Sequence, residues 1–156
     1  MPTDPIPSTD KGYAPRVNQF SIFLAHKAGA LLEVVRLLNA RNVHVVALSV
    51  QDAADTAIVR VVVSDPELVQ DIFAEHEIPF ATCELVVVEL AEGPTEIGRL
   101  LAALLAAEVN IFGSYALLTR PRGRTALALH VEDNECATSV LSAHGFTILH
   151  QSDISR

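Results

Sequence analysis

The sequence predicts an α+β protein built from two tandem βαββαβ units, each with an antiparallel sheet that carries its helices on one face. Three observations lead to this prediction. The first half has the order strand, helix, strand, strand, helix, strand. The same order recurs in the second half after a shift of 66 to 68 residues. Several strands are apolar on both faces, so the sheet face without helices must also be covered.

The first half begins with a strand and a helix joined by a glycine turn. Residues 17–25 alternate apolar side chains with others, which is typical of a strand, and residues 30–40 repeat them with the period of a helix. Gly29 lies in the turn between them. A glycine there permits a positive φ, and the N–H groups of the first helical turn are left without partners in the helix. This turn is a place where a carboxylate can bind.

The remaining elements of the first half follow from residue type and turn signals. Residues 43–50 and 56–63 are rich in β-branched side chains and predict two strands joined by a polar turn at residues 51–55. Asp65-Pro66-Glu67 is a strong helix start, with a capping carboxylate and a proline at the first helical position. Residues 80–90 predict a long strand. This order is that of a ferredoxin-like unit.

An internal repeat indicates a second copy of this unit. Residues 38–45 align with residues 104–111, and residues 63–67 align with residues 131–135. The shift grows by two residues at the hairpin of residues 119–123, and hairpin tips tolerate insertions. The second unit is then predicted as a helix, two strands, a helix and a strand at residues 96–107, 109–118, 125–131, 134–143 and 146–150.

Only one strand separates the two units, so the sequence predicts that residues 80–90 belong to both. The expected divisions of the chain are a flexible tail at residues 1–16, a first unit at 17–85 and a second unit at 80–156. A shared strand leaves almost no linker. We therefore expect the two units to form a rigid pair.

Composition limits the classes of function. The chain has 156 residues, 50% of them hydrophobic, and a formal net charge of −8, which argues against nucleic acid or an anionic membrane as a partner. Cys83 and Cys136 lack metal-ligand or disulfide spacing, so we expect reduced, buried thiols. No signal peptide or membrane-spanning segment is recognised, and we expect a cytoplasmic protein.

Catalytic and metal-binding motifs were not found in the sequence. The six histidines lack the helical i, i+4 spacing of a zinc site, and no nucleophile elbow, phosphate-binding loop or dinucleotide fingerprint occurs. We therefore expect no catalytic residue, no metal and no cofactor. Arg120, Arg122 and Arg124 form the one basic cluster, which either is a solvated hairpin tip or meets a phosphate or an acidic partner.

The chain resembles a known family in its first strand and turn. The pattern Phe20-Ser-Ile-Phe-Leu-x-x-Lys-x-Gly29-x-Leu-x-Glu-Val, the strand at residues 43–49 and the later Asn110-Ile111 resemble the ACT domain, a ferredoxin-like regulatory module that binds amino acids. From about residue 17 to residue 154 the chain is similar to small stand-alone proteins made of two tandem ACT domains.

The resemblance implies a protein that binds a free amino acid, has no catalysis of its own, forms a homodimer and reports to a regulated enzyme. ACT domains typically hold the ligand at the junction between two domains, at the turn after the first strand, the following helix start and the neighbouring strand. The residues implied in this sequence are His26, Lys27, Ala28, Gly29, Ala30, Leu31, Val45, Ala47, Ser49, Asn110 and Ile111.

Two further residues bear on the site and on the alternative function. Tyr115, two residues beyond Gly113, either lines a pocket or fills the core between the sheets. Thr95 aligns with Gly29 under the shift of 66 residues, and we expect its hydroxyl to cap the helix and compete with a ligand there. The departure at Thr95 motivates the alternative function, a ligand-free assembly module that acts as the regulatory subunit of a metabolic enzyme.

Overall fold

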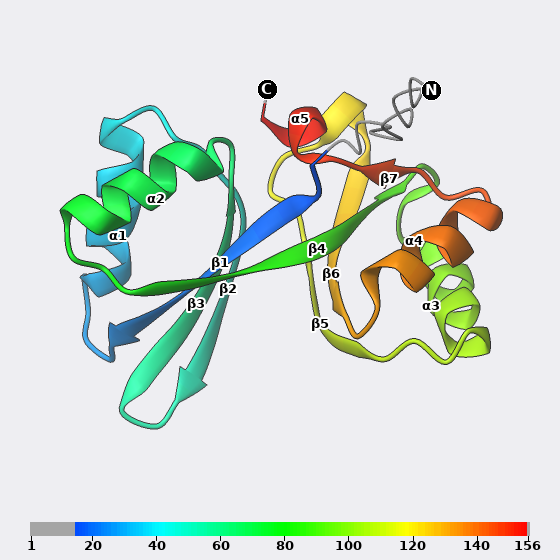
Figure 1. The fold of residues 1–156 in the computed structure, drawn as a ribbon, viewed down its shortest axis with the longest axis horizontal. Coiled ribbons are helices and arrows are strands. Elements are labelled where there is room, and N and C mark those ends of the chain that lie inside the picture. The colour runs from blue at the N-terminus through cyan, green and yellow to red at the C-terminus, as the bar shows by residue number, and fades with distance from the viewer. Residues whose placement is uncertain (1–14, 156) are drawn as a thin grey trace, which may run out of the picture.

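The structure, a computed structural model, describes residues 15–155, so the predicted tail lies almost wholly outside the described residues. Figure 1 shows two lobes joined by long central strands. The elements of the first lobe are β1 (Val17–Ala25), α1 (Ala30–Ala40), β2 (Val45–Ala53), β3 (Thr56–Val63), α2 (Pro66–Glu75) and β4 (Phe80–Leu90). Those of the second lobe are η1 (Gly93–Glu96), α3 (Ile97–Ala106), β5 (Ile111–Ala116), η2 (Pro121–Gly123), β6 (Thr125–Val131), α4 (Asn134–Ala143), β7 (Ile148–Leu149) and α5 (Gln151–Ile154).

The predicted pair of ferredoxin-like units with a shared strand is confirmed. All strand pairs are antiparallel, in the order β2-β3-β1-β4-β6-β5, with β7 also paired to β4. The first part of β4 pairs with β1, from Phe80 opposite Ile22 to Leu85 opposite Val17. Its second part pairs with β6, from Val86 opposite Leu129 onward. One strand therefore serves as the last of the first unit and the first of the second.

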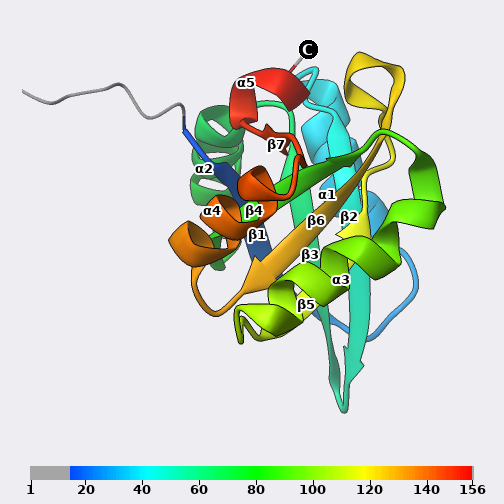
Figure 2. The ribbon, with the colours of Figure 1, turned by 90° about the vertical axis from the view of Figure 1, so that its right-hand side faces the viewer.

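The helices of each unit lie on the outer face of its own sheet. Figure 1 shows α1 and α2 on one side of the molecule and α3 and α4 on the other, and Figure 2 shows α3 and α4 over the strands of the second unit. In the first unit Phe20 contacts Phe73 of α2 edge to face, with ring centroids 5.9 Å apart. In the second, Leu100 of α3 and Leu141 of α4 pack against Leu129 of β6. Each unit thus has its own core.

The faces without helices meet each other. Val62 and Leu85 of the first unit share a buried cluster with Ala128 and Leu149 of the second. This contact confirms the expectation, drawn from strands apolar on both sides, that the open face is covered, and the cover is the second unit of the same chain. The amide of Leu118 also donates a hydrogen bond of 2.7 Å to the carbonyl of Val46, which links the two ends of the strand order.

Several boundaries differ from the prediction. β2 extends to Ala53 and leaves only Ala54 and Asp55 as the turn, because Ala54 adopts the positive φ of 57° that a two-residue hairpin requires. β7 is short, and the chain then turns into α5 instead of continuing as a strand. Within α5, Gln151 donates a hydrogen bond of 3.0 Å to the carbonyl of Val63 in the first unit. A helix of one turn carries no periodic signal in the sequence.

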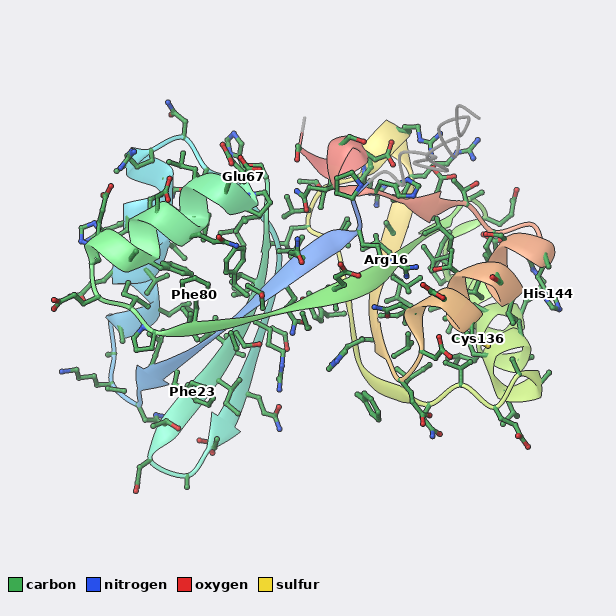
Figure 3. All side chains as sticks on the ribbon, in the orientation of Figure 1. Arg16, Phe23, Glu67, Phe80, Cys136 and His144 are labelled. Carbon is green, nitrogen blue, oxygen red and sulfur yellow. The ribbon has the colours of Figure 1, made fainter. Side chains whose placement is uncertain are left out.

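Figure 3 labels residues on both lobes. Phe23 and Phe80 lie on the first lobe, Cys136 lies on α4 of the second, and His144 is the C-cap residue of that helix. Arg16 lies between them, 3.7 Å from the Glu84 carboxylate, and donates a hydrogen bond of 3.4 Å to Thr138. Within residues 15–155, no helix combines the length and apolar character needed to cross a membrane.

Candidate functional site

The glycine turn after β1 has the conformation that the sequence predicted. Gly29 adopts a φ of 91°, in the left-handed region, and occupies the N-cap position of α1. Among the described residues no side chain caps this helix. By contrast, Asp65 accepts a hydrogen bond from the amide of Leu68 at the start of α2, and Asp133 accepts one from Cys136 at the start of α4. The amide of Ala30 donates a hydrogen bond of 3.4 Å to the carbonyl of Lys27, so the N-terminus of α1 offers the amides of the following residues to an external acceptor.

A hollow of about 310 Å³ lies against this turn. We call it the turn hollow; it is formed by the end of β1, the start of α1 and parts of β2 and β3. Its lining residues are Leu24, Ala25, His26, Lys27, Ala28, Ala30, Leu31, Val50, Ala57 and Val59. Most of these side chains are apolar, so the hollow combines a helix start that no side chain caps with an apolar wall.

The charged groups at the turn hollow come from the turn itself and the β2–β3 hairpin. His26 Nε2 lies 3.0 Å from the Asp52 carboxylate, and both side chains are largely exposed. Lys27 has no carboxylate within ion-pair distance in the part of the chain that the structure describes. From the sequence, Asp52 is predicted only as part of the polar turn at residues 51–55. The signal that places it here is the pairing of β3 with the end of β1, which brings the hairpin beside His26.

The predicted site residues of the first unit divide between four places. Five of them line the turn hollow, namely His26, Lys27, Ala28, Ala30 and Leu31, while Gly29 shapes the turn. Ala47 is buried between the two sheets and Val45 packs under the helices of the first unit. Ser49 lies on a second hollow, described below. The structure therefore brings the turn residues together but separates them from the three predicted residues of β2, although Val50 of the same strand lines the turn hollow.

The predicted residues of the second unit do not join the turn hollow. Asn110 Nδ2 donates a hydrogen bond of 2.8 Å to the carboxylate of Glu132, and Ile111 packs against the core of its own unit. Tyr115 combines the two alternatives left open by the sequence, lining a pocket and filling the core between the sheets. It packs against the core between the sheets, and it also lines the second hollow.

The second unit has its own glycine turn, two residues before the position given by the repeat. Gly93, with a φ of 71°, begins the turn of η1, which precedes α3. Thr95 lies inside η1, and its hydroxyl donates a hydrogen bond of 3.0 Å to the carbonyl of Glu92. The expected Thr95 cap is therefore wrong. A constant shift of 66 residues misaligned the turn, because the chain adds a turn of η1 before the helix.

The second hollow, of about 180 Å³, lies between the open faces of the two sheets, and we call it the inter-sheet cleft. Its lining residues are Gln19, Ser49, Gln51, Arg60, Phe112, Gly113, Ser114, Tyr115 and His130. Tyr115 donates a hydrogen bond of 2.8 Å to Gln19 Oε1 across the units. Burial raises the pKa of the Tyr115 phenol well above its usual range, so this hydroxyl stays protonated.

The basic cluster at the second hairpin has an intramolecular partner. Glu89 is buried on β4, and its carboxylate lies 3.4 Å from Arg124 and 3.7 Å from Arg122. Both arginine side chains are more than half exposed, as a solvated hairpin tip predicts, and they also pair with a buried charge of the core. In the described residues Arg120 has no ion pair.

The chain was compared with known proteins. The family model described as "ACT domain pair" matches residues 16–156. The structure is similar to that of protein BT0572 from Bacteroides thetaiotaomicron, with a TM-score of 0.82, 25% identity and coverage of 92% of this chain and 98% of that one. It also shares its fold with the ligand-free regulatory subunit of aspartate kinase from Thermus thermophilus, with a TM-score of 0.59, 13% identity and coverage of 82% and 89%.

A search of proteins with curated descriptions gave no match. The family match extends over nearly the whole chain and over both units. It agrees with the strand order, the two glycine turns and the shared strand β4. The chain therefore belongs to the ACT domain family of regulatory modules, as a tandem ACT pair.

Proposed function

We propose that this protein is an amino-acid-binding regulatory module without catalysis of its own, and that the amino acid binds in the turn hollow. One observation carries the proposal. The N-terminus of α1 is uncapped and adjoins a hollow of about 310 Å³, whereas α2 and α4 are capped by Asp65 and Asp133. At roughly 30 Å³ for each water, this volume equals about ten waters, enough for a free amino acid.

The groups at the turn hollow match the three parts of an amino acid. The carboxylate gains from the amides and dipole of the helix start and from the ammonium of Lys27. The ligand's ammonium has the Asp52 carboxylate nearby, where it competes with His26. Leu24, Leu31 and the valines of the lining provide an apolar wall. We therefore propose an amino acid with an aliphatic side chain.

A thermal-shift screen of the twenty amino acids tests this proposal. A ligand at about one hundred times its Kd adds about 2.7 kcal/mol to the free energy of unfolding. For a chain of this size that raises Tm by several degrees. We expect leucine, isoleucine or valine to give the largest shift. No shift with any amino acid would remove amino-acid binding as the function.

A matched pair of variants locates the site. Lys27→Gln removes a charge from the turn hollow, and Arg36→Gln removes the same charge from an exposed position farther along α1. We expect the first variant to weaken amino-acid binding several-fold, because a charge-assisted contact is lost. The second is expected to bind as the native chain does. Equal affinities of both variants would place the ligand elsewhere.

The similarity to the aspartate kinase regulatory subunit supports a separate enzyme as the target of regulation. That protein is described as a regulatory subunit, and the similar fold has a TM-score of 0.59. We propose that the present chain likewise acts on an enzyme made as another polypeptide. Co-purification of such an enzyme with the chain tests this role. The amount of enzyme that co-purifies is expected to change when the amino acid found in the screen is added.

An apolar stripe on α3 favours the second candidate function, a protein assembly module. Ile97, Leu101 and Leu105 follow one another at helical spacing and are 37%, 44% and 78% exposed. Exposed apolar stripes of this kind are typical of association surfaces. We propose that the stripe forms the contact of a homodimer. Light scattering of Leu105→Glu tests it, with the exposed Leu118→Glu as the control.

The expected result is a dimer in the native chain and in Leu118→Glu, and a monomer in Leu105→Glu. A chain that is monomeric at every concentration contradicts the homodimer. A dimer that persists in Leu105→Glu assigns the contact to another surface. The assembly function replaces the sensing function only where the amino-acid screen is also negative.

A further inference from the structure

The inter-sheet cleft is separate from the turn hollow and has different chemistry. It is lined by the central part of the first sheet and by β5 and β6 of the second, whereas the turn hollow lies at the helix side of the first sheet. No residue is shared between the two linings. A ligand in the cleft would contact both units of the chain at once.

One wall of the cleft carries a cation on the open face of the first sheet. Arg60 lies in the middle of β3, opposite Ser21 of β1 and Ser49 of β2. Both neighbours have small side chains, and Arg60 lines the cleft. Arg60 donates a hydrogen bond of 2.9 Å to Gln51 Oε1, which uses one of its five N–H groups. Within residues 15–155 it has no ion pair.

The charge of Arg60 acts on the interior of the cleft. Burial raises the pKa of the Cys83 thiol, and the positive charge of Arg60 offsets part of that rise. Burial likewise raises the pKa of the Tyr115 phenol on the opposite wall, and the charge of Arg60 offsets part of that rise. The guanidinium is therefore within electrostatic reach of both units.

The opposite wall adds donors and an aromatic rim. Ser114 and His130 supply polar groups from β5 and β6. Phe112 lies edge to face with the His130 ring at 5.5 Å and is largely exposed beside the cleft. Gly113 leaves its part of the wall open, since a Cβ built there meets no atom within 4 Å.

The lining contains no acidic residue, although the whole chain has a net charge of −8. An unpaired arginine therefore makes the cleft suitable for an anion. A free amino acid is less suited, because its ammonium would find no carboxylate among the lining residues. The two amide oxygens of the lining, those of Gln19 and Gln51, already accept hydrogen bonds from Tyr115 and Arg60.

We propose that the inter-sheet cleft binds a small monocarboxylate that lacks an ammonium group, with Arg60 holding the carboxylate between the two units. The remaining N–H groups of a guanidinium match the two oxygens of a carboxylate. The volume of about 180 Å³ equals roughly six waters, which restricts the ligand to a small acid. The proposal goes beyond amino-acid binding in the turn hollow and does not depend on it.

Calorimetric titration with sodium pyruvate tests the proposal, with L-alanine and sodium phosphate as comparison ligands at matched ionic strength. Pyruvate and alanine share a carbon skeleton and differ in the ammonium group, so the pair isolates the effect of that charge. Phosphate distinguishes a general oxyanion site from a carboxylate site. We expect pyruvate to bind more tightly than either alanine or phosphate at the cleft.

Three variants connect that binding to the cleft. Arg60→Gln is expected to weaken pyruvate binding at least about tenfold, because charged hydrogen bonds to the carboxylate are lost. Arg41→Gln, which removes an exposed arginine paired with Glu75, leaves pyruvate binding unchanged and controls for net charge. Gly113→Val fills the cleft without touching Arg60 and abolishes binding, and its φ is outside the left-handed region. It therefore keeps the test valid if Arg60→Gln does not fold.

Each other outcome overturns the proposal. Absence of pyruvate binding to the native chain removes the site. Pyruvate binding that survives both Arg60→Gln and Gly113→Val places the anion elsewhere. Tighter binding of phosphate contradicts a carboxylate site, and equal binding of alanine that requires Arg60 contradicts the exclusion of an ammonium. Alanine binding that depends on Lys27 and not on Arg60 belongs to the turn hollow, so the failure of one proposal is distinguishable from the failure of the other.

Discussion

The Tyr115 hydroxyl donates a hydrogen bond of 2.8 Å to Gln19 Oε1, between residues 96 positions apart in the sequence. Gln19 is 1% exposed and lies on the open face of the first sheet, while Tyr115 lies on the open face of the second. The side-chain amide nitrogen of Gln19 also contacts Ser21 Oγ and Cys83 Sγ, each at 3.4 Å. This bond is one of the contacts that join the open faces of the two sheets.

Tyr115→Phe is therefore expected to destabilise the protein by about 1–3 kcal/mol, because it leaves a buried amide oxygen without a partner. Chemical unfolding at equilibrium measures the change. The double variant Gln19→Leu/Tyr115→Phe removes both polar groups, and we expect it to recover part of the loss. A single variant as stable as the native chain would show that the hydroxyl does not matter to the contact.

The buried carboxylate of Glu89 gives a second prediction. Arg122→Gln/Arg124→Gln leaves this carboxylate without either of its partners, and such an uncompensated charge costs about 3–5 kcal/mol. Each single variant is expected to cost less, because the other arginine remains. Thermal unfolding gives the order of stability. Arg120→Gln, on the same hairpin, serves as the control and should leave Tm unchanged.

The caps of the helices give a third prediction. Asp65→Ala and Asp133→Ala each remove a side chain that accepts an amide at a helix start, at a cost of about 1 kcal/mol. Thr95→Ala removes only a hydroxyl that donates to the Glu92 carbonyl, and we expect a smaller loss. Unfolding by urea compares the three variants. A Thr95 variant as damaged as the aspartate variants would restore the capping role expected from the repeat.

Glu96 gives a prediction about pH. The backbone amide of Glu92, at 2.9 Å, and the Arg99 guanidinium, at 2.6 Å, lower the pKa of this carboxyl below its ordinary value of 4.5. Because the folded-state pKa is depressed, the stabilisation is complete above 4.5 and is lost as the pH falls through the folded-state value.

Glu96→Gln should therefore reduce stability at neutral pH and flatten the decline of stability in acid. Tm measured between neutral pH and strongly acidic pH compares it with Glu108→Gln, whose side chain makes no hydrogen bond or ion pair among the described residues. Parallel pH profiles of Glu96→Gln and the native chain would contradict the assigned role of Glu96.

Much of the fold could be predicted because its signals are local. The alternation of residues 17–25, the helix start at Asp65 and the positive φ at Gly29 depend on nearby residues, and all three agree with the structure. The meeting of the two sheets was also predictable, since strands apolar on both faces need a second cover. The length of β4 then required that both sheets share it.

The candidate site could be predicted only in part, because contacts between distant strands have no local signal. Ala47 and Ser49 lie on the same face of β2, two residues apart, yet one is in the core between the units and the other is on the cleft. Arg60 has no motif in the sequence, and its cleft exists only where the second sheet faces it. Asp52 likewise reaches His26 through strand pairing.

The central claim is that an amino acid binds at the N-terminus of α1. Titration of the isotope-labelled chain with the amino acid that gives the largest thermal shift, followed by amide chemical shifts in NMR spectra, tests it most directly. We expect saturable shifts concentrated on Lys27, Gly29, Ala30 and Leu31. Saturable shifts that leave these four amides unchanged, or no shifts with any aliphatic amino acid, would contradict it.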